Sequence, residues 1–307
     1  MYLRAISIGY AVPHIDFDVV VHSVFRSAVN LKPKGESLLF TLLVSGETDL
    51  PQGIRLDTPT GFSFEELPVG IPGICQGGIL SLESFSLTMD LRNANRWDSN
   101  LLTLRANMNN PSVIAAWQST WQTLNDQQVN SGSGLIAEDL FYPSSKKQSA
   151  LVQRINESLH SILKATRQCN LVDNNEIGTL IGLGTGLTPS GDDLLTGYMA
   201  GLWCTSKGRS ERLNFLSTLG EVVIRLSEGT NDISRTYLYH AARGQVSSRL
   251  FNLADAICTG SDPQQVRDCA RSAMRAGHTS GMDTVTGLLF GLAAWDLLPF
   301  MTSVVPI

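Results

Sequence analysis

The spacing of hydrophobic residues changes about one third of the way along the chain. Before residue 110, apolar residues either alternate with polar ones, as over residues 85–91, or gather in short runs such as residues 37–45. Alternation with a period of two is typical of a strand with one buried face, and frequent Gly and Pro residues separate these segments. We therefore predict a β-rich N-terminal domain over residues 1–109.

After residue 110 the apolar spacing becomes helical. Trp117, Trp121 and Leu124 recur at intervals of three or four residues, and the same spacing returns over residues 151–162. Such spacing places the apolar side chains on one face of a helix. The pattern predicts an α+β protein in which a β-rich N-terminal unit precedes a mostly α-helical domain over residues 110–307.

Composition narrows the functional classes. The net charge is −5 and no run of basic residues occurs, which disfavours nucleic acid and anionic membranes because both are bound through Lys and Arg. The five cysteines are widely spaced and form no C-x-x-C pair, as expected of reduced thiols in a cytosolic protein.

Targeting signals are weak. The N-terminal apolar stretch is interrupted by Pro13 and Asp16, so it is a poor signal peptide. Of two apolar stretches near the C-terminus, residues 194–203 are too few to span a bilayer and residues 285–301 contain Asp296. We expect a soluble, cytoplasmic protein.

The most informative feature is an internal repeat. Residues 190–202 read SGDDLLTGYMAGL and residues 280–292 read SGMDTVTGLLFGL, with identical residues at seven of thirteen positions. Ser190 and Ser280 are placed to accept hydrogen bonds from the backbone N–H groups of a helix start. Two glycines four residues apart in each copy share one helix face. We expect the two helices to pack closely, with their N-termini beside a shared pocket.

A glycine-rich loop precedes the first copy. Residues 182–189 read GLGTGLTP, and such a loop before a helix start leaves backbone N–H groups available to an anion. The loop matches neither a Walker A motif nor the dinucleotide-binding fingerprint, and Ser190 is not in a G-x-S-x-G elbow. Ordinary helix capping is the alternative interpretation. The candidate substrate- or phosphate-binding residues are Gly184, Gly186, Thr188, Ser190, Gly191, Asp192, Thr279, Ser280 and Gly281.

Acidic residues complicate a simple phosphate site, because carboxylates repel anions. Asp192, Asp193 and Asp283 could cap neighbouring amides, orient a substrate amide, or hold Mg²⁺ that bridges to a phosphate. We favour capping or substrate orientation. No metal ligand is therefore assigned, and Mg²⁺ is kept as an optional cofactor.

Two basic residues are further candidates. Arg243, at the end of a predicted helix over residues 234–244, could clamp a carboxylate or phosphate, or could simply complement the helix C-terminus. His278 could donate to an oxyanion or shuttle a proton, or be an ordinary turn histidine. With Asp193 and Asp283, these two residues complete the candidate catalytic set.

Three motifs carry a resemblance to a known family. They read GLGTGLTPSGDD at residues 182–193, SRTYLYHAARG at residues 234–244 and AGHTSGMDTVTG at residues 276–287. In this order and spacing the chain resembles the H subunit of bacterial oxamate carbamoyltransferase, from the anaerobic allantoin degradation branch of purine catabolism.

The resemblance implies one subunit of a three-component enzyme, beside an acyl-CoA-synthetase-like subunit and a further large subunit. The implied reaction converts oxalurate and phosphate to oxamate and carbamoyl phosphate, or is a related carbamoyl or acyl transfer. Loop and helix-start amides would bind phosphate or a developing oxyanion. Arg243 and His278 would meet the carboxylate end, and Asp193 and Asp283 the amide nitrogen. The alternatives are a non-catalytic assembly subunit and a stand-alone, Mg²⁺-dependent hydrolase or nucleotide-binding enzyme.

Overall fold

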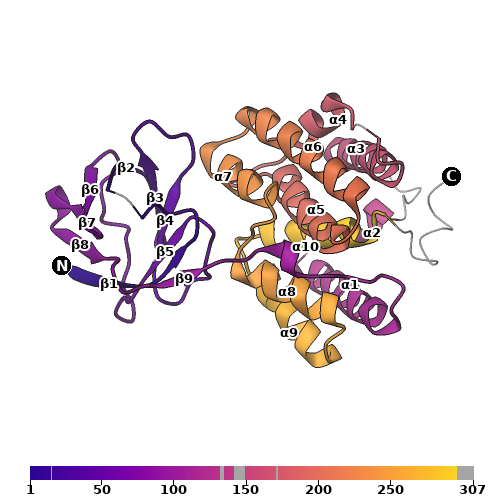
Figure 1. Cartoon of the computed structure of the whole chain (residues 1–307), viewed down its shortest axis with the longest axis horizontal. Helices are drawn as coiled ribbons and strands as arrows, with labels where there is room; N and C mark the ends of the chain where they lie inside the picture. Colours follow the sequence, from indigo (N-terminus) through magenta and orange to yellow (C-terminus); the bar gives the residue numbers. More distant parts are fainter. Residues whose placement is uncertain (15, 132–134, 142–148, 171, 296–307) are drawn as a thin grey trace. The chain divides into compact units, whose positions relative to one another are not determined.

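The computed structural model describes residues 1–14, 16–131, 135–141, 149–170 and 172–295. The chain divides into two compact units, Met1–Ser99 and Asn100–Ile307, each with its own hydrophobic core. Among the described residues, Figure 1 shows the strands in the first unit and the α-helices in the second. The prediction of a β-rich unit followed by a helical one is confirmed.

The units divide at residue 100, whereas the sequence pattern changes near residue 110. The residues between these positions precede the first long helix, but Leu101, Leu104 and Met108 are buried in the helical core. Leu101 begins a short 3-10 turn over Leu101–Thr103, and Leu104 and Met108 follow it. The boundary between the two units therefore lies about ten residues before the point at which the apolar spacing in the sequence becomes helical.

The first unit is a β-barrel of short strands. Its strands are β1 (Tyr2–Gly9), β2 (Phe17–Val24), β3 (Ala28–Pro33), β4 (Phe40–Leu43), β5 (Gly53–Leu56), β6 (Pro72–Gln76), β7 (Ile79–Leu82), β8 (Leu87–Asp90) and β9 (Asn95–Trp97). They pair in the order β5-β4-β3-β2-β6-β7-β8-β1, and pairing between β1 and β5 closes the ring. In β1, Leu3 and Ala5 are buried while Tyr2 and Arg4 are exposed, as alternation requires.

The alternating segment over residues 85–91 is only partly a strand. Its second half forms β8, whereas Glu83–Phe85 is a 3-10 turn that ends at Ser86, which has a left-handed φ of 52°. Phe85 is accordingly exposed rather than buried. The second predicted strand, over residues 37–45, is confirmed as β4, in which every residue is buried.

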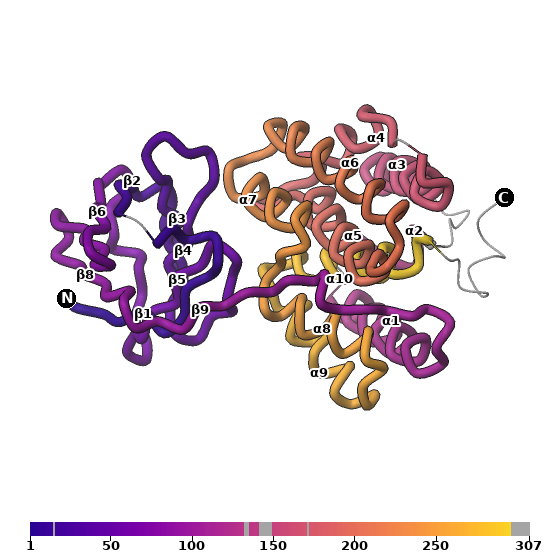
Figure 2. The backbone as a smooth tube through the Cα atoms, in the orientation of Figure 1, coloured from indigo at the N-terminus to yellow at the C-terminus, as the bar shows by residue number. Residues whose placement is uncertain are grey.

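The second unit is built on two central helices. Its helices are α1 (Pro111–Ser131), α2 (Ala137–Phe141), α3 (Ala150–Arg167), α4 (Asn174–Leu180), α5 (Ser190–Ser206), α6 (Ser210–Leu226), α7 (Asp232–Ala241), α8 (Ser248–Thr259), α9 (Pro263–Met274) and α10 (Ser280–Ala293). Figure 2 traces α5 and α10 through the middle, with α6 and α7 on one side and α1, α8 and α9 on the other. Nearly all residues of α5 and α10 are buried, which explains their apolar sequence. No helix in the described part of the chain is both long and apolar enough to cross a membrane.

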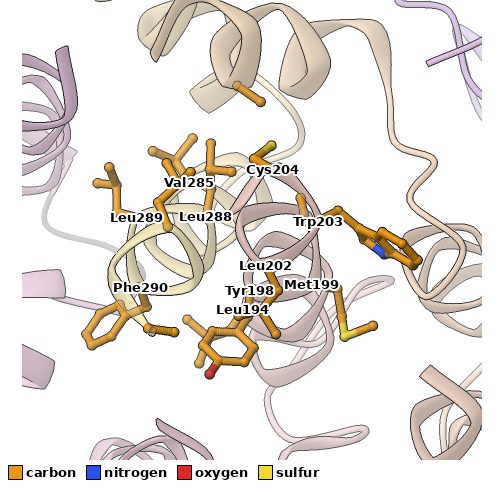
Figure 3. Close-up of a cluster of buried hydrophobic side chains, with 14 of the residues drawn as sticks. Leu194, Tyr198, Met199, Leu202, Trp203, Cys204, Val285, Leu288, Leu289 and Phe290 are labelled. Carbon is orange, nitrogen blue, oxygen red and sulfur yellow. The ribbon is translucent and has the colours of Figure 1, made fainter. Parts of the chain in front are cut away.

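The two central helices pack in parallel through their glycines. A Cβ atom added to Gly197 would lie 1.9 Å from the carbonyl oxygen of Thr284, and one added to Gly287 would lie 2.0 Å from that of Leu194. Figure 3 shows large side chains such as Tyr198 projecting away from the contact, so the two backbones touch directly. The close approach predicted from the glycine spacing is confirmed.

These contacts are reciprocal. Gly197 contacts Thr284 and Leu288, and the equivalent Gly287 contacts Leu194 and Tyr198. Because Leu194 and Thr284 occupy equivalent positions of the repeat, as do Tyr198 and Leu288, each helix contacts the other in the same way. The pair therefore has a local twofold axis along its length, and both N-termini lie at the same end.

Candidate functional site

The starts of α5 and α10 meet through side chains. Thr188, just before α5, and Ser280, the first residue of α10, share a hydrogen bond of 2.6 Å between their hydroxyl oxygens. The Ser280 hydroxyl also lies close enough to Asp193 to lower its pKa, and the Ser190 hydroxyl does the same to Asp283. Each helix thus presents its first serine to the aspartate of the other helix.

This crosswise arrangement corrects one prediction. Ser190 and Ser280 are not helix caps, because the N-cap residues are Pro189 and Thr279. Within the described chain, neither of these residues makes a side-chain capping hydrogen bond. The serines lie one position later, and their hydroxyls turn to the facing helix. Two helix N-termini, each carrying partial positive charge, consequently lie side by side without side-chain caps.

Asp193 and Asp283 are buried at equivalent positions in the first turns. Asp193 is 8 % exposed and Asp283 is 0 % exposed. The Oδ2 atom of each has no hydrogen-bond partner in the part of the chain that the structure describes. The Oδ1 atom of Asp283 accepts a hydrogen bond of 3.0 Å from the backbone N–H of Leu135. One buried acceptor in each carboxyl is thus left open.

Burial also changes the ionisation of this pair. It raises the pKa of Asp193 well above 3.8, the nearby Ser280 and Thr188 hydroxyls oppose the shift, and the charge of Asp283 adds to it. Burial likewise raises the pKa of Asp283, and the Leu135 N–H opposes the shift. Both carboxyls therefore hold a proton more readily than a carboxyl in water does.

Asp192, unlike Asp193 beside it, has a hydrogen-bond partner for each of its carboxyl oxygens. Its Oδ1 atom accepts a hydrogen bond of 2.8 Å from the backbone N–H of Gly182, and its Oδ2 atom one of 2.6 Å from the Thr230 hydroxyl. Burial raises the pKa of Asp192, while both hydrogen bonds lower it. Because each oxygen already has a partner, this carboxyl holds the glycine-rich loop against α7 rather than facing a ligand.

The glycine-rich loop approaches the start of α5 closely. Gly184 has a φ of 124°, and a Cβ atom there would lie 2.7 Å from the backbone nitrogen of Ser190. The next candidate, Gly186, is exposed and has open space around its Cα. Gly191 and Gly281 instead pack against backbone carbonyls of the preceding helices, Leu180 and Ala273 respectively. Only the middle of the loop is therefore open to a ligand.

Arg243 is not brought to this site. Its guanidinium lies 3.7 Å above the ring of Tyr239 and donates to the carbonyl of the same residue. The adjacent Gly244 packs on Trp203, which lies near the C-terminal end of α5. Trp203 follows Ser190 by thirteen residues, about 20 Å along the helix axis. The position supports the alternative interpretation of this arginine as a cation at a helix C-terminus.

His278 lies next to the site but outside its buried part. It is exposed and stands two residues before Ser280, in the turn that leads into α10. The neighbouring Thr279 lies close enough to Asp283 to lower its pKa. Within the described residues, no group of three or more His, Cys, Asp or Glu side chains is arranged to hold a metal ion.

Sequence analysis missed a third helix start. Asn231 caps α7 by accepting from the backbone N–H groups of Ile233 and Ser234, and its side-chain amide donates to the carbonyl of Leu187 at 2.9 Å. With Thr230 bonded to Asp192, α7 begins against the glycine-rich loop. An Asn cap just before the motif at residues 234–244 was the available signal.

Comparison with known families covers both units. Residues 180–292 match the family described as oxamate carbamoyltransferase subunit AllH, and residues 5–96 match the AllH family N-terminal domain. The first match contains α5, α7 and all but the last residue of α10, and the second contains β2 to β8 and parts of β1 and β9. No solved structure matches the chain. On the strength of both matches, the chain belongs to the AllH family, which is named for a subunit of oxamate carbamoyltransferase.

Proposed function

We propose that this chain binds a small anionic substrate at the paired starts of α5 and α10, as a subunit of a carbamoyltransferase complex. The reaction is carbamoyl transfer between oxalurate and phosphate, giving oxamate and carbamoyl phosphate, or a closely related carbamoyl or acyl transfer. The observation that carries the proposal is the pair of buried aspartates, Asp193 and Asp283, at two helix N-termini that lie in contact and whose N-cap residues make no side-chain capping hydrogen bond. The family membership supplies the reaction class.

The charge distribution suits a small anion. Two parallel helices direct their positive ends to the same place, and backbone N–H groups at a helix start bind phosphate and carboxylate. The exposed loop around Gly186 adds further backbone groups at the edge. Because burial favours the protonated form of Asp193 and Asp283, the pair repels an anion less than two ionised carboxylates would.

Within this site the residues have separate roles. Thr188 and Ser280 place hydroxyls at the junction, where they contact the substrate or its leaving phosphate. His278, exposed at the edge, donates a hydrogen bond to the carboxylate end of oxamate or oxalurate. Asp192 positions the loop without touching the ligand, and Arg243 has no part in binding.

The remaining chemistry belongs to partner subunits. We assign no covalent nucleophile to this chain, since in its described part the hydroxyls of Thr188 and Ser280 hydrogen-bond to each other and not to a histidine. We propose a synthetase-like subunit and a further large subunit as partners, acting together in anaerobic allantoin degradation in the cytoplasm. Preorganised amides and hydroxyls in this chain would stabilise charge in the transition state.

Ligand-induced stabilisation tests the proposal. Phosphate, carbamoyl phosphate and oxamate are titrated against the full chain while its thermal unfolding is followed. A ligand present at 100 times its Kd adds about 2.7 kcal/mol to the free energy of unfolding. We expect this gain in the wild type and in Arg243→Ala, but not in Thr188→Val. Stabilisation by none of the three ligands, or equal loss in both variants, would contradict the assigned site.

A further inference from the structure

We infer that Arg235, on α7, is the cation that binds the oxyanion group of the substrate at the glycine-rich loop. The inference rests on the proposed function and names the residue that brings a positive charge to it. The oxyanion is the carboxylate of oxamate or oxalurate, or the phosphate group of the second substrate. A planar guanidinium can bind either one through two parallel N–H bonds.

The residues just before α7 lie along the glycine-rich loop. The side-chain amide of Asn231 donates a hydrogen bond of 2.9 Å to the carbonyl of Leu187. At the other end of the loop, a Cβ atom added to Gly182 would lie 3.1 Å from the carbonyl oxygen of Gly229. The start of α7 therefore contacts the loop at its first residue and again next to Gly186, which is exposed.

The guanidinium of Arg235 lies at this end of α7. Side chains in a helix lean toward its N-terminus, and residues four apart share a face, so Arg235 lies on the face that begins with Asn231. An ion pair agrees with this direction, since the Nη1 atom of Arg235 lies 3.6 Å from the Oδ1 atom of Asp232, the first residue of α7. The charge is therefore held at the end of the helix that contacts the loop.

This guanidinium has donors to spare. Its side chain is only 23 % exposed, and its Nε atom is buried without a hydrogen-bond partner in the described part of the chain. The separation of 3.6 Å from Asp232 is longer than a hydrogen bond. Arg55, by contrast, donates to one aspartate through two nitrogens, at 2.8 and 3.3 Å, and Arg92 does so at 2.9 and 2.7 Å. Arg235 therefore carries a half-buried charge without the paired hydrogen bonds that such a group normally makes.

The position of this charge is unfavourable without an anion. Cations destabilise a helix start, because the N-terminus already carries partial positive charge. Among the described residues, Arg167 also has buried guanidinium nitrogens without partners, but it is the last residue of α3, where a cation is favourable. An oxyanion at the open middle of the loop would offset the charge of Arg235 and the positive end of α7 together. Backbone N–H groups around Gly186 would donate to the same oxyanion.

Isothermal titration calorimetry of the full chain with phosphate and with oxamate tests the assignment. In Arg235→Gln, at least one of the two ligands should bind about tenfold more weakly or worse, because charge-assisted hydrogen bonds are lost. A loss for oxamate alone assigns the carboxylate, a loss for phosphate alone assigns the phosphate group, and a loss for both shows that they share the position. Arg271→Gln is the matched control, since Arg271 forms the same kind of ion pair with Asp268 on α9, at 3.4 Å, and should leave both affinities unchanged.

A second variant acts in the opposite direction. Asp232→Asn removes the negative charge beside Arg235 and should tighten binding of the same ligand about threefold. Affinities equal to those of the wild type in Arg235→Gln would overturn the inference while leaving the proposed anion site in place. If Arg235→Gln does not fold, unchanged or weaker binding by Asp232→Asn would overturn it instead. Binding of neither ligand to the wild type would overturn the inference together with the proposed function.

Discussion

At the scale of single residues, the helix starts contain buried acids, and no cationic side chain of the described residues shifts their pKa values. Asp193 faces the first residue of α10, and Asp283 faces the first residue of α5. An isolated buried carboxylate is costly, so such a group shifts its pKa upward and takes up a proton. The pair therefore links the stability of the helical unit to pH.

The first prediction concerns this link, measured as the free energy of unfolding in urea at several pH values. The folded pKa of Asp193 is raised above the value of 3.8 that it has when exposed, so the folded state keeps a proton that the unfolded state releases. The stabilisation by protonated Asp193 is complete below pH 3.8 and is lost as the pH rises through the raised pKa. The wild type should therefore lose stability relative to Asp193→Asn over this interval. Parallel pH profiles for the two proteins would contradict the assigned shift.

A second prediction at this scale concerns Asp192 and Thr230. Their hydrogen bond of 2.6 Å ties the glycine-rich loop to the start of α7. Thr230→Val leaves a buried carboxyl oxygen unpaired and should cost about 1–3 kcal/mol of unfolding free energy. A double-mutant cycle with Asp192→Asn should give a coupling energy of about 1 kcal/mol or more. Additive effects of the two substitutions would show that the contact does not stabilise the loop.

At the scale of elements, the parallel packing of α5 and α10 depends on residues without side chains. Gly197 and Gly287 each lie too close to a carbonyl of the other helix to admit a Cβ atom. Since both helices are buried, neither can move outward without opening the core. The positions of the two helix starts therefore follow from packing several turns away.

The third prediction tests this dependence with alanine substitutions. Gly197→Ala or Gly287→Ala should lower the free energy of unfolding by about 3 kcal/mol, because a Cβ atom would collide with backbone at 1.9 or 2.0 Å. Gly178→Ala in α4 is the matched control, since nothing lies within 4 Å of its added Cβ. There alanine should be neutral or stabilise by up to about 1 kcal/mol. Chemical denaturation measures both, and similar effects at the three positions would disprove the packing argument.

The helices were easier to predict from the sequence than the contacts that individual side chains make. The repeat at residues 190–202 and 280–292 predicted both the helices and their glycine contact, because spacing fixes which residues share a helix face. Spacing does not show where a hydroxyl points, so the role of Ser190 was mispredicted as a cap. Arg243 was predicted to clamp a carboxylate or phosphate, but the turn after α7 packs its neighbour Gly244 on Trp203, near the C-terminal end of α5. The position of Arg243 depends on how the helices pack in three dimensions, which the spacing of residues along the sequence does not show.

At the scale of the whole molecule, the chain consists of two units with separate cores. The barrel closes on itself through β1 and β5, and its core contains residues from the first unit alone. A closed barrel has no long unpaired edge strand and can bury its apolar face without a partner. The N-terminal unit is therefore expected to be an independent folding unit.

The fourth prediction is that a fragment of residues 1–99 folds alone. It ends where the two units divide, before Leu101 enters the helical core. The fragment should give dispersed amide resonances and a single cooperative unfolding transition. A fragment ending at residue 80 is the control, since it cuts β7, lacks β8 and β9, and cannot close the ring. A disordered 1–99 fragment would show that the barrel needs the helical unit.

The central claim is that the starts of α5 and α10 form one ligand site, and a crystal structure of the full chain with saturating oxamate tests it most directly. The account predicts electron density for oxamate beside Thr188 and Ser280, at the junction of the two helices. Oxamate bound elsewhere would contradict it.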